Sequence, residues 1–312
     1  MNDINIVSEV FKCILFADDT SLESIISLFP ARTISGISRK VNDELSKLID
    51  WLRANKLSLN VKKTKYMQFR YPQKSPSLMT KLTLKMNNTP IEKVTHFDFL
   101  GLRISETLSW KDHIDKVKSK ISKITGSMYR IRNQVNSKIL LAIYNSLILS
   151  HLHYGILCWG FQGHHLFKLQ KRAVRTICKK KYNDHTDPLF KQLKLLKVMD
   201  IFKTQCLKFF KRLNISKLPN YFLSNFNFSR SCDVHNRSLR NTNVYRREHT
   251  NKHLSRNTIR HYIPSLLNET DRSLINYMQS HSILSAKKKI KNHYLGFYKM
   301  ECDKVFCYVC GK

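Results

Sequence analysis

An apolar repeat in the middle of the chain constrains the fold more than any other feature. Over residues 114–135 the apolar side chains follow one another at alternating intervals of three and four. This spacing places them on one face of an α-helix, so it predicts a long amphipathic helix that packs on a partner. Two further helices are predicted, over residues 137–159, which are apolar nearly all round, and over residues 165–178. We therefore expect a three-helix bundle.

The predicted bundle is basic. Residues 116–183 contain fourteen Lys or Arg and no Asp or Glu, in a chain of 312 residues with a net charge of +33. Ordinary protein surfaces mix both signs, so this excess indicates a polyanionic partner, with nucleic acid as the first candidate. Six basic side chains of the first helix are expected off its apolar stripe, where they suit phosphate contacts: Lys116, Lys118, Lys120, Lys123, Arg130 and Arg132.

The sequence shows no signal of secretion or membrane insertion. The longest apolar stretch, residues 139–152, is broken by Asn145, Ser146 and Ser150 and is shorter than the ~18 residues that a membrane span needs. The first twelve residues do not resemble a signal peptide. Eight cysteines do not form the dense framework of a small secreted domain. We expect no membrane segment and an intracellular location, in the nucleus or in a cytoplasmic ribonucleoprotein.

The N-terminal third predicts a small sheet with one helix. Two apolar stretches, residues 11–16 and 22–29, flank Asp18 and Asp19 in a pattern of strand, tight turn and strand. Apolar residues spaced on one face predict a helix over residues 41–52 that ends near residue 55. Further short strands are expected at residues 65–70, 82–86 and 97–104. The fold class is thus α+β, with a small antiparallel sheet followed by the bundle and a mostly helical C-terminal part.

The two adjacent carboxylates, Asp18 and Asp19, are the sharpest chemical feature. Two carboxylates at a turn can collect a divalent cation, and two-metal phosphoryl transfer needs such ligands. Neighbouring side chains diverge on a hairpin, so one would bind the metal while the other orients it. An Asp pair before Thr20 and Ser21 is also ordinary turn chemistry, so the pair alone leaves both interpretations open.

The surroundings of the pair resemble a known family. Phe16-Ala17-Asp18-Asp19 resembles the aromatic-Ala-Asp-Asp hairpin of reverse transcriptases. Residues 51–64, which end in Lys63-Thr64 after a Leu-Asn pair, look like the next palm motif of that family, and residues 99–101 resemble its primer-grip hairpin. Residues 110–114 and 143–160 are similar to its thumb. The chain as a whole resembles the C-terminal part of a non-LTR retrotransposon reverse transcriptase of the jockey type, well over residues 1–181 and loosely beyond.

The resemblance implies an organisation and an activity. Residues 1–105 would be a partial palm, residues 106–181 a helical thumb, and residues 182–312 a basic C-terminal extension. The implied activity is RNA-directed DNA polymerase, with deoxynucleoside triphosphates, an RNA template, a DNA primer and the RNA–DNA hybrid as partners, and two Mg²⁺ ions as cofactors. The oligomeric state stays open.

The resemblance also assigns roles to single residues. Asp18 would bind Mg²⁺, Asp19 would lie beside it, and Lys63 would lie near the phosphates of the incoming nucleotide. The alternative for Lys63 is a solvated lysine in a basic chain. The primer-grip residues are equally consistent with strand core and a bulge. The implied nucleic-acid contacts are Phe99, Leu100 and Gly101 in the primer grip, and Lys116, Lys120, Lys123 and Arg130 in the thumb.

The comparison with the family predicts that part of the active site lies outside this sequence. Asn2-Asp3-Ile4 resembles the segment before the catalytic hairpin, so Met1 is expected to be internal to a longer polymerase whose first metal-binding Asp lies upstream. Mg²⁺ relies on several carboxylates together with substrate phosphates. We therefore expect that this chain alone does not polymerise, and that its strands have open edges.

A second metal site is conceivable at the C-terminal end. Cys302, Cys307 and Cys310, together with His293, could form a tetrahedral Cys₃His zinc site, although three free thiols are the alternative. Two other functions also remain open. One is a non-catalytic nucleic-acid-binding relic of a decayed element. The other is a helical interaction protein with an accidental Asp pair, which predicts that residues 11–26 do not form a hairpin.

Overall fold

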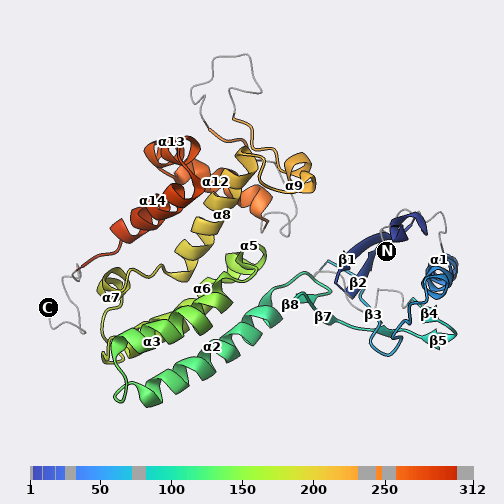
Figure 1. Cartoon of the computed structure of the whole chain (residues 1–312), viewed down its shortest axis with the longest axis horizontal. Coiled ribbons are helices and arrows are strands. Elements are labelled where there is room, and N and C mark those ends of the chain that lie inside the picture. The colour runs from blue at the N-terminus through green and yellow to red at the C-terminus, as the bar shows by residue number, and fades with distance from the viewer. Residues whose placement is uncertain are drawn as a thin grey trace. The chain divides into compact units, whose positions relative to one another are not determined.

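The structure is a computed structural model with two compact units, Met1–Ser109 and Trp110–Lys312 (Figure 1). It describes residues 3–8, 10–17, 19–24, 33–71, 82–230, 244–247 and 258–300. Helices and small β-sheets together confirm the α+β class.

The described residues of unit 1 form one long helix and four pairs of short strands. Helix α1, Ile34–Ala54, begins where the Thr33 side chain accepts a hydrogen bond from the Gly36 backbone, which satisfies an otherwise unpaired N–H group. The helix ends at Asn55, as predicted. The pairs are β1 (Lys12–Phe16) with β2 (Asp19–Glu23), β3 (Lys65–Tyr66) with β6 (Glu92–Lys93), β4 (Lys85–Met86) with β5 (Thr89–Pro90), and β7 (His96–Phe99) with β8 (Leu102–Ser105). Only β3 and β6 run parallel, and the single antiparallel sheet that we expected is replaced, in the described residues, by these separate pairs.

Residues 97–104 form a hairpin, as the resemblance of residues 99–101 to a hairpin predicted, whereas the apolar pattern alone predicted a single strand there. Leu100 and Gly101 link β7 to β8 with φ angles of 47° and 80°. Two consecutive positive φ angles give a tight turn whose twist matches that of the strands it joins. Glycine adopts such angles readily whereas leucine rarely does, so the apolar pattern gave little sign of the turn.

The core of unit 1 lies between α1 and the segment that carries β4. One face of α1 packs on this segment, and the Asn42 side chain fixes their alignment by donating to the Thr83 carbonyl (3.0 Å) and accepting from the Lys85 N–H (3.0 Å). The buried apolar side chains are Val41, Leu45, Ile49, Leu82, Leu84, Met86 and Ile91.

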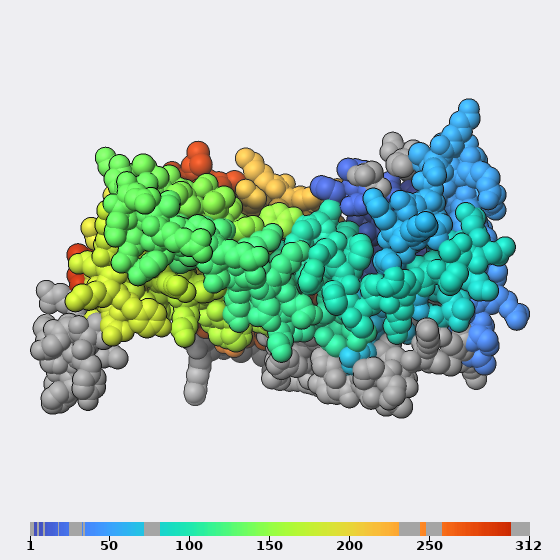
Figure 2. All heavy atoms as spheres, turned by 90° about the horizontal axis from the view of Figure 1, so that it is seen from below, coloured from blue at the N-terminus to red at the C-terminus, as the bar shows by residue number. Residues whose placement is uncertain are grey.

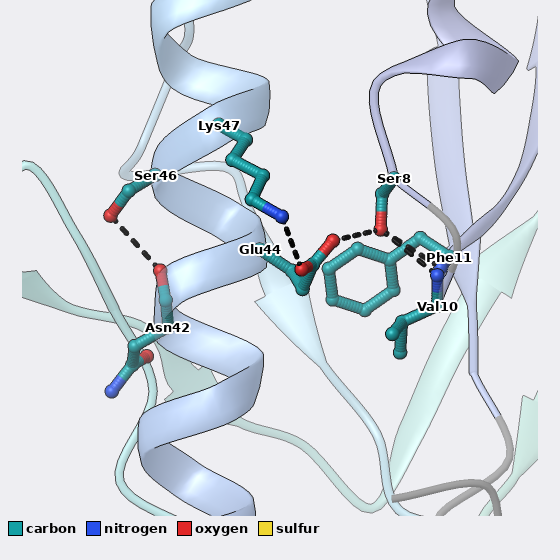
Figure 3. A network of polar contacts seen from close by, with 7 residues as sticks. All are labelled: Ser8, Val10, Phe11, Asn42, Glu44, Ser46 and Lys47. Atoms are coloured by element: carbon teal, nitrogen blue, oxygen red, sulfur yellow. Dashed lines mark hydrogen bonds and ion pairs between the residues drawn. The ribbon is translucent and has the colours of Figure 1, made fainter.

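A buried carboxylate ties the segment before β1 to this core (Figure 3). Glu44 of α1 is 3% exposed, accepts a hydrogen bond from Ser8 Oγ (2.5 Å) and pairs with Lys47 Nζ (2.7 Å). Ser8 Oγ in turn accepts from the backbone N–H groups of Val10 and Phe11 (3.2 and 3.1 Å). Burial acts to raise the pKa of Glu44, but the bonds from Lys47 and Ser8 outweigh it and hold this pKa below its ordinary value.

The secondary structure of the described part of unit 2 is helical, apart from an isolated β-bridge between Arg230 and Tyr245. The predicted first and third helices of the bundle are confirmed as α2 and α6, which pack on each other. The helices are α2 (Lys111–Ile131), α3 (Ser137–Ile143), the π-helical turn η4 (Tyr144–Ile148), α4 (Leu149–His153), α5 (Ile156–Trp159), the 3₁₀ turn η5 (Gly160–Gln162), α6 (His164–Ile177), α7 (Asp187–Gln192), α8 (Val198–Asn214), α9 (Asn220–Asn225), α12 (Ile259–Glu269), α13 (Arg272–Ser280) and α14 (Ile283–Gly296).

The predicted helix over residues 137–159 contains a π-helical turn and is broken at Gly155, so the expectation of one continuous helix is wrong. A π-helical turn separates α3 from α4, and Gly155, at a φ of 60°, ends α4 before α5 begins. The burial is also one-sided, because Ile139 and Leu147 are exposed. The fully buried side chains recur every fourth residue, at Leu140, Tyr144, Ile148 and Leu152.

No single described helix is long and apolar enough to span a membrane. By length and composition alone, one bent pair of helices, Ser137–His153 with Ile156–Gln162, would be long and apolar enough for a span. Its side chains at positions 140, 144, 148 and 152 are buried within unit 2, as in the core helix of a folded domain.

The residues after position 181 pack on the bundle. Helix α8 contacts α4, α5 and α6 of the bundle and also the C-terminal helices α12, α13 and α14. Gln170 of α6, only 1% exposed, joins the parts: its Nε2 donates to Tyr144 Oη and to the Leu196 carbonyl (both 2.9 Å), and its Oε1 accepts from the Val198 N–H (2.8 Å). The first N–H of α8 therefore bonds to a side chain of α6.

The end of α14 is fastened to the start of α8. Tyr298 Oη donates to Asp200 Oδ2 (2.5 Å) and accepts from the Lys197 N–H (2.9 Å). Burial raises the pKa of Asp200, although the bond from Tyr298 opposes this effect. Because Tyr298 closes on α8, the C-terminal helices and the bundle share one core.

We expect replacement of Gly160 by Ala to destabilise unit 2 by about 1–3 kcal/mol, the usual cost of overpacking a core. A Cβ atom at Gly160 would lie 2.2 Å from the ring of Phe202, which is fully buried and stacks on Tyr262. Thermal or urea unfolding of the full chain measures the change. Gly126→Ala is the control, since nothing lies within 4 Å of its added Cβ. Equal stability of the two variants would contradict this packing.

We expect Glu44→Gln to destabilise the protein near pH 7 by about 1–3 kcal/mol, the range for a buried hydrogen bond to a charged group. The folded-state pKa of Glu44 lies below its ordinary value of 4.5, so the stability that it adds is present above pH 4.5 and is lost as pH falls through the folded-state pKa. Urea unfolding at pH 7 and pH 3 therefore shows a difference between wild type and variant that shrinks in acid. The exposed Asp50, changed to Asn, is the control. A difference that does not depend on pH would refute this role of the carboxylate.

Candidate active-site hairpin and nucleic-acid interface

Asp19 lies on a β-hairpin, as predicted. Strands β1 and β2 pair antiparallel up to Phe16 opposite Asp19, which leaves the two residues 17 and 18 as the link. Asp19 is exposed at the first position of β2, and Ala17 has a φ of 53°. Asp18 lies outside the described residues. The hairpin contradicts the alternative of an interaction protein with an accidental Asp pair, which required this segment not to form one.

The hairpin is exposed at its tip and anchored at its base. Ile14 and Phe16 are 42% and 58% exposed, and neither strand pairs with a third strand among the described residues, as the prediction of open edges requires. At the base, Leu22 packs against the core of unit 1, and Cys13 Sγ contacts the Ile4 carbonyl at 3.9 Å. The carboxylate of Asp19 is thus held at the solvent-exposed end of an anchored element.

Lys63 lies in a turn that is organised by Asn60. The Lys63 N–H donates to the backbone carbonyl and to Oδ1 of Asn60 (3.1 and 3.2 Å), and Thr64 Oγ1 donates to the same carbonyl (3.0 Å). These bonds explain the Asn and the Thr of the motif as turn chemistry. The Lys63 side chain is exposed and forms no ion pair with a described residue. Its role near a triphosphate stays a prediction.

The described residues contain no group of three or more His, Cys, Asp or Glu side chains that could hold a metal ion. Asp19 supplies one carboxylate of the hard oxygen type that Mg²⁺ prefers. Asp18, the predicted direct ligand, falls outside the described part of the chain. The magnesium site therefore stays a prediction.

The predicted primer-grip residues occupy the tip of the β7–β8 hairpin. Phe99 and Leu100 are half-buried, whereas Gly101 is exposed. Arg103 binds Asp98 on the opposite strand through two hydrogen bonds (3.0 and 2.9 Å). At the base of the hairpin, the largely buried pair of Arg70 and Glu106 (2.8 Å) joins it to the segment after β3. These contacts stiffen a surface hairpin, and primer contact by its tip stays a prediction.

Four of the six predicted basic residues of α2 lie in one line. Lys116, Lys120, Lys123 and Arg130 are spaced at i, i+4, i+7 and i+14, and none of them is buried. With 1.5 Å of rise per residue, this basic stripe is about 21 Å long. The helix buries its opposite face, which includes Ile114, Val117, Ile121 and Met128, and Figure 2 shows α2, in blue-green to green, at the molecular surface.

The other two predicted basic residues of α2 lie toward the buried face. Lys118 follows Ile114 by four positions and pairs with Asp115 (3.2 Å). Arg132 comes 18 residues, or five full helical turns, after Ile114 and so lies on the same side of the helix. Its guanidinium carbon lies 4.0 Å from the centre of the Tyr129 ring. Both are half-buried. The stripe of four is therefore the part of α2 that best suits contact with phosphates.

The zinc prediction stays untested. Cys302, Cys307 and Cys310 lie outside the described residues. His293, in the last turn of α14, is half-buried and contacts the rings of Tyr294 and Phe297 (5.4 and 4.9 Å between centroids). Burial lowers the pKa of His293, which favours the neutral imidazole that a metal would need.

Two residues with structural roles near these candidates could not be recognised from the sequence. Glu44 and Gln170 are buried polar groups within amphipathic helices, where a single polar residue looks like any solvated one. The Trp159-Gly160 motif has a packing role as well, because Trp159 is fully buried, donates to the Tyr154 carbonyl (2.8 Å), and precedes the glycine pressed against Phe202.

Comparisons of the chain with models of known protein families, with curated proteins and with solved structures find no match.

Proposed function

We propose that the chain is part of an RNA-directed DNA polymerase of a non-LTR retrotransposon. The β1–β2 hairpin would be the metal-binding turn of a palm, and α2 would be the thumb helix that contacts the RNA–DNA hybrid. The observation that carries the proposal is that Phe16-Ala17-Asp18-Asp19 spans a tight hairpin on which Asp19 is exposed. A carboxylate buried in a helix or in an apolar core could not serve this chemistry.

Phosphoryl transfer requires oxygen ligands for a metal ion, which the hairpin would supply, and a positive charge near the triphosphate, which Lys63 would supply. Asp18 and Asp19 would hold Mg²⁺, which when bound neutralises charge on the attacking and leaving oxygens of phosphoryl transfer. Lys63, exposed on its turn, would attract the triphosphate of a deoxynucleotide. Two carboxylates are few for two Mg²⁺ ions, so we expect no primer extension by this chain alone.

The α2 stripe suits the backbone of a duplex rather than its bases. Four cations along about 21 Å can neutralise phosphates without reading sequence. Such contacts release counterions, so the affinity falls steeply with salt. A polymerase that copies templates of any sequence needs this kind of sequence-independent binding.

A second candidate is a nucleic-acid-binding protein without catalysis. The observation that favours it is that the α2 stripe belongs to unit 2 and needs no carboxylate of unit 1. The two candidates differ in whether the hairpin binds a divalent cation, so the following two experiments address metal binding and hybrid binding separately.

We expect Fe²⁺, used in place of Mg²⁺ with ascorbate and peroxide, to cut the polypeptide close to residue 18 when an RNA–DNA hybrid and a deoxynucleotide are present. Asp18→Asn with Asp19→Asn removes the carboxylates and abolishes the cut. Gel electrophoresis with mass spectrometry of the fragments measures it. Asp50→Asn with Asp43→Asn, on α1, matches the change in charge and leaves the cut unchanged. If cleavage persists in the hairpin variant, the polymerase proposal is contradicted, and the second candidate, a nucleic-acid-binding protein without catalysis, is favoured.

We expect Lys120→Gln with Lys123→Gln to weaken binding to an RNA–DNA hybrid about tenfold at 150 mM salt. Each lost phosphate contact lowers the slope of log affinity against log salt by about 0.9 for a duplex, so the slope falls by nearly two. Fluorescence anisotropy with a labelled hybrid measures both values. Lys118→Gln with Arg132→Gln removes the same charge from the same helix but off the stripe. An equal loss in both variants would mean that only net charge matters.

A further inference from the structure

A second group of cations gathers where α8 and α14 pack together. The two helices run antiparallel, since Tyr298 meets the start of α8 while Lys287 lies near Lys208 toward its end (Figure 1). We define the α8–α14 basic cluster as Lys208 and Arg212 on α8 with Lys287 and Lys291 on α14. Each pair is separated by four residues, so its members lie on the same face of their helix, about 6 Å apart along the axis.

The cluster brings like charges together without compensation among the described residues. None of its four members forms an ion pair with a described acidic side chain. Lys208 and Lys291 are half-buried, while Arg212 and Lys287 are exposed. The pKa of Lys208 is lowered, first by burial and then by the charges of Lys287 and Arg212. The pKa of Lys291 is lowered as well, first by burial and then by the charges of Lys287 and Lys194. This arrangement opposes folding by repulsion and is relieved by a bound polyanion.

Helix α4 lies between this cluster and the α2 stripe. His153 of α4 contacts Gln205 of α8 (2.9 Å), and burial together with the charges of Lys208 and Lys287 lowers the pKa of His153. His151, two residues earlier, has its pKa lowered by burial and by Lys120 of the α2 stripe. Cations of the α2 stripe and of the α8–α14 basic cluster thus lie near the two histidines of α4.

We propose that the α8–α14 basic cluster binds the phosphodiester backbone of a single nucleic-acid strand. A strand presents one phosphate per nucleotide and is flexible enough to reach the half-buried ammonium groups of Lys208 and Lys291 in the seam between the helices. A flat anionic membrane meets only the most exposed side chains, so it fits these two lysines poorly. The site goes beyond the function proposed above, because it belongs to the C-terminal helices and holds a separate segment of nucleic acid from the duplex on α2.

The test is the binding of a 20-nucleotide single strand, RNA or DNA, to the full chain carrying Lys287→Gln with Lys291→Gln. We expect about tenfold weaker binding at 150 mM salt and a salt slope smaller by about 1.4, because each lost contact with a single strand contributes about 0.7. The control, Lys217→Gln with Lys289→Gln, removes the same charge; Lys289 lies instead over the ring of Tyr277 (5.5 Å). Lys287→Arg with Lys291→Arg keeps the charge and retains binding.

Three results would overturn the proposal. One is an equal loss in the control, which would mean that net charge alone binds the strand. Another is a loss in the Arg variant, which would point to packing instead of charge. The third is unchanged strand binding with lost binding to phosphatidylserine vesicles, which would identify a membrane as the partner. Failure of the polymerase proposal is seen separately, in the iron cleavage at the hairpin, and failure of the α2 stripe in the hybrid-binding variant.

Discussion

The amide of Gln170 is the contact on which the arrangement of unit 2 depends. It binds the Tyr144 hydroxyl in the π-helical turn, the Leu196 carbonyl before α8 and the first N–H of α8 itself. In a core closed to water, any of these groups left unpaired would cost about 1–3 kcal/mol, so the three segments keep one register. Once the start of α8 is fixed, the contacts of that helix with α4 and α14 follow.

This framework keeps apolar side chains inside and cations on two outer surfaces. The α2 stripe faces away from Ile114, Val117 and Ile121, and the α8–α14 basic cluster lies where α8 and α14 pack together, near His153 of α4. Repulsion within each surface opposes folding, whereas a polyanion that binds only the folded chain adds to its stability. The excess of positive charge is thus organised by the core rather than spread at random.

The sequence predicted the elements whose signal is periodic and missed those set by tertiary contacts. The repeat over residues 114–135 located α2, and the apolar stretches around Asp18 located the hairpin. The apolar pattern alone did not show the Leu100-Gly101 turn, because Leu is rare at positive φ, and only the family resemblance indicated a hairpin there. The break at Gly155 was missed because a single Gly within a largely apolar segment is compatible with a continuous helix. The cation cluster could not be predicted, since its members lie about 80 residues apart in the chain and meet only when α14 folds back on α8.

The hairpin that carries the carboxylates is weaker than the framework of unit 2. Two strands alone are marginally stable in water, and the exposed Phe16 adds nothing to the hairpin's own burial. Its position therefore depends on what lies at its base: Leu22 in the core, and Ser8 bound to the buried carboxylate of Glu44. Acid that protonates Glu44 loosens this anchor, so the geometry of the hairpin declines as the pH falls through the folded-state pKa of Glu44, which lies below its ordinary value.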